Sequence, residues 1–336
     1  MVSQVDKSNM RQVILDFPTQ LETGLKCAQR AIPIIKNPVT KIVIAGMGGS
    51  ALPGELLKLV AGNGSILSRP AEIHIHRNYG LPYYADDQTL VICISYSGGT
   101  EEAISAYDEA RVRKLPVAVI AMGGALLEKA LRDGVAVAQI PTTHIQPRSA
   151  IGYQFAALIK ILSNAGIISL QDDALIAAAK SLSPASSERH GKTIAVKLAR
   201  RTPLFYASQA NKALAYILKI KINENAKTMA FYNYFPELNH NEMVGFTQPQ
   251  NKFSILMLTD RSDNPHIQRR MDLTADIAKK YHIPVLPIDI TNERIYNKVF
   301  NALLLGDWIS YYLAILYKTD PTPVKIVEEL KKRLAK

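Results

Sequence analysis

The chain has 336 residues, of which 48% are hydrophobic and 21% charged, so it can bury a substantial core and is long enough for two domains. Its apolar runs are too short to span a bilayer, its polar N-terminus lacks the apolar core of a secretory signal, and its two cysteines cannot build a disulfide framework, so we expect a cytoplasmic protein with no membrane partner. The net charge of +11 comes from scattered basic residues without a nucleic-acid-binding motif, which predicts a solvated basic surface and no nucleic-acid partner.

The first half of the chain alternates between segments with helical spacing and short apolar runs. Helical spacing predicts helix within about residues 5–35, and apolar runs that stop at glycine or polar residues predict buried parallel strands. We predict strands at Lys41–Ala45, Glu72–His76, Leu90–Ile94, Pro116–Ala121 and Ala136–Ile140, and helices at about 50–60, 101–113, 126–132, 151–165 and 173–181. This alternation predicts a doubly wound sheet with right-handed crossovers.

Ser183–Ser187, with the sequence SPASS, is the best candidate for a linker, because the same alternation restarts after it. The later elements that we predict are strands at 203–207, 253–259 and 285–288, and helices at about 192–198, 211–225, 265–281, 299–318 and 324–335. The sequence therefore predicts an α/β fold with two domains, residues 1–182 and 188–336, each a mainly parallel sheet flanked by helices.

Gly46–Ala51, with the sequence GMGGSA, stands where the first strand should pass into its helix. Glycines let a ligand approach the backbone closely, and the amides at a helix N-terminus favour an anion. The same residues fit the dinucleotide pattern G-x-G-x-x-A, which makes an NAD(P) domain the alternative. Such a domain should place an acidic residue at the end of its second strand, but that strand ends in His76 and Arg77, where only a 2′-phosphate could be received.

A second loop, SYSGGT at Ser95–Thr100, follows the third predicted strand and opens a helix. Ser95, Ser97 and Thr100 bring three hydroxyls together with the amides of the helix start, which suits the three oxygens of a phosphate monoester. The simpler interpretation is capping, with Ser97 or Thr100 as the N-cap and the glutamates after it favouring the helix dipole. The neighbouring glycine loop favours phosphate binding over simple capping.

These motifs resemble those of a known group. A strand, Ser-x-Ser-Gly-x-Thr and a helix are characteristic of sugar isomerase (SIS) domains, and the downstream motifs are similar to those of the bifunctional phosphoglucose/phosphomannose isomerase family. The matching stretches are GMGGSA, SYSGGTEEA, QPRSAIGY, KINENAK, FPELNHNE and DPTPVKIVEELK, spread from Gly46 to Lys331. NENAK followed by PELNHNE is the narrowest match. The chain departs from the family pattern at Gly99, where Asn is common, and at Ala51–Pro53.

The resemblance implies two SIS domains and an aldose–ketose isomerase that converts glucose 6-phosphate, and mannose 6-phosphate as a second substrate, to fructose 6-phosphate. This reaction opens the sugar ring and moves a proton between C1 and C2 through a cis-enediolate. It needs a carboxylate base, an acid–base group for ring opening and a cation, but neither a metal nor another cofactor.

By the resemblance Glu224 is the base, although spacing alone leaves Glu237 and Glu242 as competing carboxylates. His240 lies in a loop crowded with polar side chains, and histidine suits ring opening because it titrates near neutral pH. The resemblance implies that His240 acts in the partner subunit's site of a homodimer. Metal ligation by His240 with Glu237 or Glu242 is the alternative, but the histidines of the chain show no H-E-x-x-H spacing.

Two cations complete the predicted site. A guanidinium is permanently charged, and the resemblance puts Arg148 near C1 and C2 of the sugar. The family's closing helix carries a lysine near the ring oxygen, for which Lys331 is our assignment, with Lys332 and Lys325 as alternatives. The phosphate would be held by six residues of the two loops, namely Gly48, Gly49, Ser50, Ser95, Ser97 and Thr100. A non-catalytic SIS regulator and an NAD(P) oxidoreductase are the alternative functions.

Overall fold

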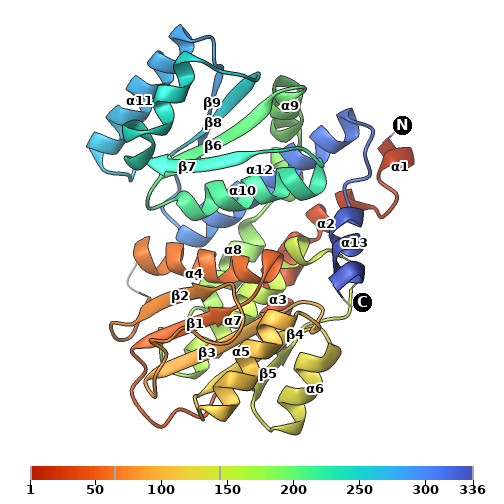
Figure 1. Ribbon diagram of the computed structural model, residues 1–336, viewed down its shortest axis with the longest axis vertical. Helices are drawn as coiled ribbons and strands as arrows, with labels where there is room; N and C mark the ends of the chain where they lie inside the picture. Colours follow the sequence, from red (N-terminus) through yellow and green to blue (C-terminus); the bar gives the residue numbers. More distant parts are fainter. Residues whose placement is uncertain (1, 64–65, 144, 335–336) are drawn as a thin grey trace. The chain divides into compact units, whose positions relative to one another are not determined.

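The computed structural model describes residues 2–63, 66–143 and 145–334, and it divides the chain into two compact units (Figure 1). The N-terminal unit is Asp16–Leu182, and the C-terminal unit is Ser183–Lys336 together with Met1–Leu15. The helices α1 (Val2–Val5) and α2 (Met10–Leu15) thus belong to the C-terminal unit, whereas the predicted first domain started at residue 1.

Long-range contacts explain why these first residues belong to the C-terminal unit. Arg11 forms an ion pair with Glu188 at 2.8 Å, and the Tyr311 hydroxyl donates to the Asp6 carboxylate at 3.2 Å. Met10 is buried in the same unit. Partners so distant in sequence leave no local pattern, so the sequence did not reveal this arrangement.

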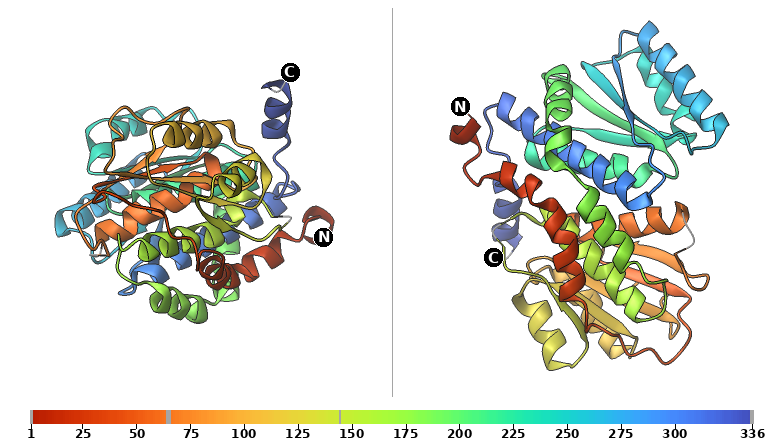
Figure 2. Two further views of the ribbon diagram at one scale, coloured as in Figure 1. Left: turned by 90° about the horizontal axis from the view of Figure 1, so that it is seen from below. Right: turned by 180° about the vertical axis from the view of Figure 1, so that it is seen from behind.

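The N-terminal unit contains a five-stranded parallel sheet of order β2-β1-β3-β4-β5. Its strands are β1 (Lys41–Ala45), β2 (Glu72–His76), β3 (Thr89–Ser95), β4 (Val117–Ala121) and β5 (Ala136–Gln139). One face is covered by α5 (Glu101–Val112) and α6 (Gly124–Arg132). The other is covered by α4 (Leu52–Asn63) and α7 (Ile151–Asn164), and α3 (Phe17–Cys27) lies along α7 and next to α8 (Asp172–Ser181) (Figure 2, right). Because both faces are covered, the central strands β1, β3 and β4 are nearly continuous apolar runs.

The C-terminal unit contains a four-stranded parallel sheet of order β7-β6-β8-β9. Its strands are β6 (Thr202–Ser208), β7 (Phe231–Phe235), β8 (Phe253–Thr259) and β9 (Val285–Asp289). On one face lie α9 (Glu188–Leu198), α10 (Lys212–Asn225) and α12 (Ile295–Leu316), and on the other lie α11 (Pro265–Lys280) and the 3-10 turns η4 (Glu237–His240) and η5 (Glu242–Thr247). The last helix, α13 (Lys325–Leu334), is exposed along its length.

One helix, α12, is long and apolar enough to cross a membrane by length and composition. However, 78% of its most apolar window is buried inside the fold. Gly191 of α9 explains part of this burial, because a Cβ at that position would lie 2.4 Å from Cβ of Trp308 in α12. The helix is therefore the core helix of the C-terminal unit.

The predicted α/β fold with parallel sheets flanked by helices is confirmed, and most predicted strands agree with the observed ones to within a residue or two. The strand β7 was missed, because Asn233 interrupts its apolar residues and all of its residues except Phe235 are exposed or half-buried. The segment predicted as a linker contains a 3-10 turn, η3 (Pro184–Ser187). Ala335, the predicted end of the last helix, lies outside the described residues.

Candidate active site

The two predicted phosphate loops lie side by side at the carboxyl edge of the N-terminal sheet. Gly46–Ser50 follows β1 and Ser95–Thr100 follows β3, and these two strands are hydrogen-bonded neighbours. After β1 the chain continues to β2 on one side, and after β3 it continues to β4 on the other side, so the strand order reverses between β1 and β3. Ligands of open α/β sheets bind at such a point of reversal. The backbone amide of Tyr96 donates to Oγ of Ser50 at 3.0 Å, which joins the two loops.

The hydroxyls of the second loop have different surroundings. Ser95 is fully buried; its Oγ donates to Oγ1 of Thr100 at 2.9 Å and accepts from the amide of Gly98 at 3.0 Å. Ser97 is exposed and accepts weakly from the amide of Gly99 at 3.3 Å. Thr100 occupies the N-cap position of α5, but its side chain makes no capping hydrogen bond to the helix. Ser95 therefore holds the shape of the loop, while Ser97 and the start of α5 face outward.

Two glycines allow the loops to pack closely. Gly98 has a φ of +71°, and a Cβ there would lie 1.6 Å from the carbonyl oxygen of Gly123. Gly49 lies against the segment that carries Arg148, since a Cβ at Gly49 would lie 2.6 Å from the Arg148 amide. Only glycine fits these two positions without movement of neighbouring backbone.

The segment around Arg148 is the third part of this edge. Arg148 lies in a 3-10 turn, η2 (Pro147–Ser149), and only 1% of its surface is exposed. The Gln20 amide donates to the Ser149 carbonyl at 2.8 Å, and the Gln154 amide donates to the Pro147 carbonyl at 3.2 Å. Side chains of α3 and α7 thus hold the turn in place, and the turn carries a permanent positive charge next to the glycine loop.

The predicted base and the predicted ring-opening group both belong to the C-terminal unit. Glu224 is half-buried in the last turn of α10, and its carbonyl accepts from Nζ of Lys227 at 2.5 Å. His240 is exposed at the end of η4. Lys331, like the alternatives Lys325 and Lys332, is exposed on α13, so burial does not separate the three assignments.

Glu224 and His240 are carried by elements on opposite faces of the C-terminal sheet. The ring of Tyr232 in β7 packs against Tyr216 of α10, with 5.1 Å between the centroids. The next residue, Asn233, donates to the carboxylate of Glu242 in η5, on the other side. Because successive strand residues point to opposite faces, the helix with the predicted base and the turns around the predicted histidine lie on different sides of β7.

The competing carboxylates have partners of their own. The Tyr206 hydroxyl donates to Oε1 of Glu242 at 2.5 Å, and Asn233 binds the other oxygen. Burial and this carboxylate both raise the pKa of Tyr206, so the hydroxyl stays protonated as a donor. Glu237 is exposed and accepts from Asn241 at 2.7 Å. No local motif of the sequence marks Tyr206, although a tyrosine in a buried strand predicts a hydroxyl that needs a partner.

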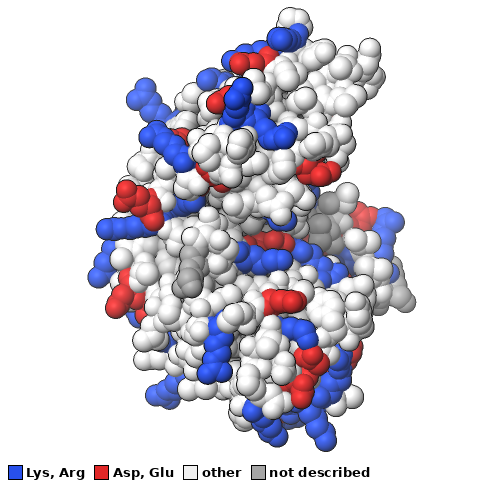
Figure 3. Space-filling view, turned by 90° about the vertical axis from the view of Figure 1, so that its left-hand side faces the viewer, with Lys and Arg blue, Asp and Glu red and all other residues white. Residues whose placement is uncertain are grey.

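Two further features concern the alternative of an NAD(P) domain and the charge of the surface. Arg77, the proposed receiver of a 2′-phosphate, forms an ion pair with Glu55 of α4 at 2.6 Å. On the face shown in Figure 3, Lys and Arg are dispersed among Asp and Glu, as expected of a solvated surface.

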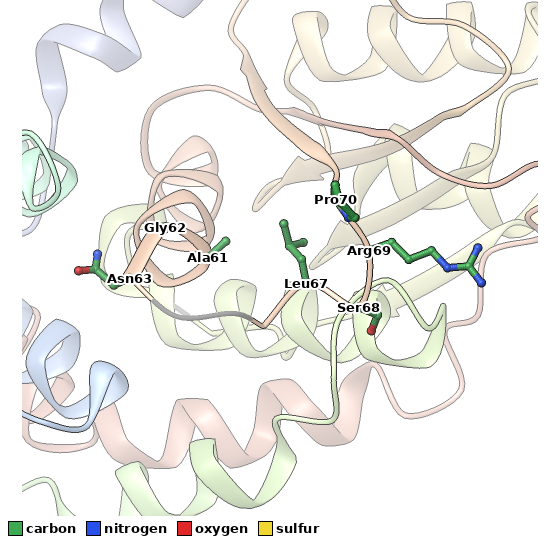
Figure 4. Close-up of a pocket in the computed structure, with 7 residues that line it drawn as sticks. All are labelled: Ala61, Gly62, Asn63, Leu67, Ser68, Arg69 and Pro70. Atoms are coloured by element: carbon green, nitrogen blue, oxygen red, sulfur yellow. The ribbon is translucent and has the colours of Figure 1, made fainter.

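A cavity of about 550 Å³ lies near the C-terminal end of α4, at the opposite edge of the sheet from the phosphate loops (Figure 4). In the close-up Arg69 extends away from Ala61 and Leu67. The cavity is lined by Ala61, Gly62, Asn63, Leu67, Ser68, Arg69 and Pro70 and includes none of the predicted site residues.

Comparisons with known proteins agree with this architecture. A family model described as the bacterial phospho-glucose isomerase C-terminal SIS domain matches residues 187–334. The crystal structure of tagatose-6-phosphate ketose/aldose isomerase from Escherichia coli superposes with a TM-score of 0.65 at 14% identity, and the match covers 93% of this chain and 95% of that chain.

Relatives with higher identity cover most of the chain. The D-glucosamine-6-phosphate 4-epimerase of Sulfolobus acidocaldarius is 33% identical over 70% of this chain and 73% of its own length. The bifunctional phosphoglucose/phosphomannose isomerase of Caldicellulosiruptor bescii is 36% identical over 97% of this chain and 99% of its own length. On this similarity, which spans both units, the chain belongs to the bifunctional phosphoglucose/phosphomannose isomerase family.

Proposed function

We propose that this protein is a cytoplasmic aldose–ketose isomerase that interconverts glucose 6-phosphate and mannose 6-phosphate with fructose 6-phosphate without a metal or redox cofactor. The observation that carries the proposal is the pair of neighbouring loops at the carboxyl edge of the N-terminal sheet, where hydroxyls and helix-start amides are presented together. The family relationship identifies the anion as a sugar phosphate.

In this proposal the two loops hold the phosphate. The hydroxyls of Ser50, Ser97 and Thr100 and the amides of Gly48 and Gly49 surround its oxygens. Ser95 contributes through the hydrogen bonds that shape its loop. The positive end of the α5 helix dipole further stabilises the phosphate dianion, because the Thr100 side chain does not cap this helix.

The chemistry follows from the remaining residues. His240 assists ring opening, and Glu224 then removes the C2 proton of the open-chain aldose to give a cis-enediolate. Glu224 returns the proton to C1 while a proton passes from O2 to O1, which yields the ketose. Arg148 stabilises the negative charge of the enediolate, and Lys331 binds near the ring oxygen. The loss of one C2 proton and the gain of one C1 proton leave the redox state of the sugar unchanged overall.

We further propose that His240 serves the partner subunit of a homodimer. This is supported by the positions of α10 and η4 on opposite faces of one sheet, which separate Glu224 from His240 within a chain. Mixing inactive Glu224→Gln and His240→Ala proteins under exchange conditions should restore up to about a quarter of the activity, because one site of each mixed dimer has both groups. Each variant refolded alone is the control, and failure of any mixture to recover activity would exclude shared sites.

The decisive test is an assay with fructose 6-phosphate in the presence of EDTA, in which glucose 6-phosphate and mannose 6-phosphate are measured separately. We expect both products from the wild type, and no C2 proton exchange from Glu224→Gln despite retained binding. Binding without turnover would favour the regulator, and saturable binding of NAD(P) would favour the oxidoreductase. Conversion of glucosamine 6-phosphate to its 4-epimer would instead place the activity with that of the epimerase relative.

A further inference from the structure

The helices α10 and α12 pack against each other along the C-terminal unit, and the character of their contact changes along its length. Toward the start of the contact it is apolar and close, since a Cβ at Gly306 would lie 2.7 Å from Cγ of Leu218. At the last turn of α10 the contact becomes polar. Nζ of Lys221 donates to Asp307 at 2.5 Å, and the Asn225 amide donates to Oγ of Ser310 at 2.9 Å.

These two contacts follow one another along the helices, and we call them the two rungs. Lys221 and Asn225 are four residues apart on α10, and Asp307 and Ser310 are three apart on α12, so each pair lies on one face of its helix. Oγ of Ser310 also donates to the Asp307 carbonyl at 3.0 Å, which links the rungs on the α12 side. All four residues are buried, between 0% and 7% exposed. We call them the α10 clamp.

The predicted base lies between the two rungs. Glu224 follows Lys221 by three residues and directly precedes Asn225. Its own backbone carbonyl is held by Lys227, whose Nζ also donates to the carbonyl of Pro321 at 3.0 Å. The last turn of a helix normally frays, because its final carbonyls have no partner within the helix. Here that turn is tied at three successive points.

Stability alone does not explain why these contacts are polar. A buried ion pair gains little over a well-packed apolar pair, because desolvation of both charges offsets their attraction. Hydrogen bonds are directional, so they fix the rotation and register of a helix more narrowly than apolar contacts do. A polar clamp next to a carboxylate is therefore expected where the orientation of that carboxylate matters.

We propose that Lys221, Asn225, Asp307 and Ser310 are positioning residues that fix the last turn of α10, and thereby the orientation of the Glu224 carboxylate for proton transfer. The inference rests on the proposed isomerase function. It assigns to the clamp an effect on proton transfer that is separate from substrate binding, because the phosphate loops belong to the N-terminal unit.

Asp307→Asn and Ser310→Ala test the proposal, and Asp260→Asn is the matched control. Asp260 forms an equally buried ion pair with Lys298 of α12, at 2.6 Å, but has no contact with the last turn of α10. We expect Asp307→Asn to lower kcat by on the order of 10- to 100-fold, and Ser310→Ala by a smaller factor, with KM for fructose 6-phosphate changed less than about threefold. Asp260→Asn should lower Tm without lowering kcat.

Backbone amide exchange across residues 222–226 supplies a measurement that does not depend on turnover. Asp307→Asn and Ser310→Ala should accelerate exchange there, whereas Asp260→Asn should not. Unchanged exchange in both clamp variants overturns the proposal, whether or not the wild type is an isomerase. Faster exchange with unchanged kcat in an active enzyme also overturns it, since the clamp would then be only structural. If Asp307→Asn does not fold, Ser310→Ala, which removes a single hydroxyl, gives the answer.

Discussion

The four strands of the C-terminal sheet have the same order as the first four strands of the N-terminal sheet, but the carboxyl edges of the two sheets are built from different residues. In the N-terminal unit, β1 and β3 run into loops with the sequences GMGGS and SYSGGT. In the C-terminal unit the corresponding strands, β6 and β8, are followed by Gln209–Asn211 and Asp260–Asn264, which contain no glycine. The first edge presents backbone amides and hydroxyls, while the second is occupied by larger side chains.

A buried polar cluster occupies the C-terminal edge. Nζ of Lys298 lies 2.6 Å from the Asp260 carboxylate, which also accepts from Ser262 at 2.7 Å and from the Asn211 amide at 3.2 Å. Burial raises the pKa of Asp260, but Lys298 and Ser262 outweigh it and hold the pKa below its usual value, so the carboxylate stays charged. Lys298 thus lies at the carboxyl edge of the C-terminal sheet, the edge at which the N-terminal unit would bind its ligand in our proposal. In our proposal similar sheets carry a binding site in one unit and a structural cluster in the other, so the residues and not the topology decide the function.

The largest effect is expected from Gly98→Ala in the N-terminal edge. A Cβ there would overlap the Gly123 carbonyl oxygen, and the positive φ is unfavourable for alanine, so we expect a loss of about 3 kcal/mol or more in unfolding free energy. Gly99→Ala is the control, because its Cβ would meet only the Ser97 hydroxyl, at 4.0 Å. Denaturant unfolding of both variants measures the difference. Equal stabilities would show that the tight loop packing is not required.

In the C-terminal edge, Lys298→Met should cost about 3 kcal/mol, because it leaves the Asp260 carboxylate buried without its charged partner. The KM for fructose 6-phosphate should stay within about twofold of the wild-type value, since this edge binds no phosphate in our proposal. Unfolding curves and steady-state kinetics on the same preparation test both parts. A large rise in KM at unchanged stability would mean that this edge takes part in substrate binding.

The sequence predicted the parts of the molecule that depend on local patterns. Lys41–Ala45 is a strand with the predicted bounds, because an apolar run bounded by turn residues indicates a buried parallel strand. Glu72–His76 is also a strand with the predicted bounds, although polar and apolar residues alternate in it. The adjacency of the two loops also followed from the strand alternation. The edge strand β7 was missed, since Asn233 interrupts its apolar residues and only Phe235 at its end is buried.

What the sequence left open depends on contacts between distant residues. Three hydroxyls in SYSGGT looked equivalent, but the structure buries Ser95 inside its loop and exposes Ser97. Glu242 competed with Glu224 on spacing alone, and the structure shows that Tyr206, from another strand, donates to its carboxylate. Neither outcome is contained in a local motif, because each is set by how separate elements pack.

Removal of one hydroxyl from the carboxyl edge of each sheet should have a smaller effect, and it compares the two edges directly. Ser97→Ala should raise KM for fructose 6-phosphate about tenfold, which corresponds to the loss of one hydrogen bond to a charged phosphate, about 1.4 kcal/mol. Ser208→Ala, at the carboxyl end of β6, should leave KM unchanged. Steady-state kinetics of the two variants decide the matter, and equal KM values would remove Ser97 from the phosphate site.

The smallest effect concerns the pH dependence of the C-terminal edge. Burial and the nearby Asp260 raise the pKa of Asp263 above its unfolded value, although hydrogen bonds from Ser208 and Asn211 oppose the shift. The folded state therefore keeps this proton to higher pH than the unfolded state does. The resulting stability is fully present below the unfolded pKa, near pH 4, and is lost as the pH rises through the folded pKa.

Asp263→Asn removes this titration while it keeps the acceptor that Asn211 uses. Its stability relative to the wild type should therefore increase between about pH 4 and pH 7. Replacement of a carboxylate with a lowered pKa, such as Asp289, should instead lower the relative stability as the pH rises from about 2 to about 4, because that carboxylate ionises below its unfolded pKa in the folded state. Denaturant midpoints of the Asp263→Asn and Asp289→Asn variants from about pH 2 to about pH 7 measure the two slopes. If both variants lose stability relative to the wild type as the pH rises, the raised pKa of Asp263 is wrong, and the C-terminal edge accommodates a second charged carboxylate without cost.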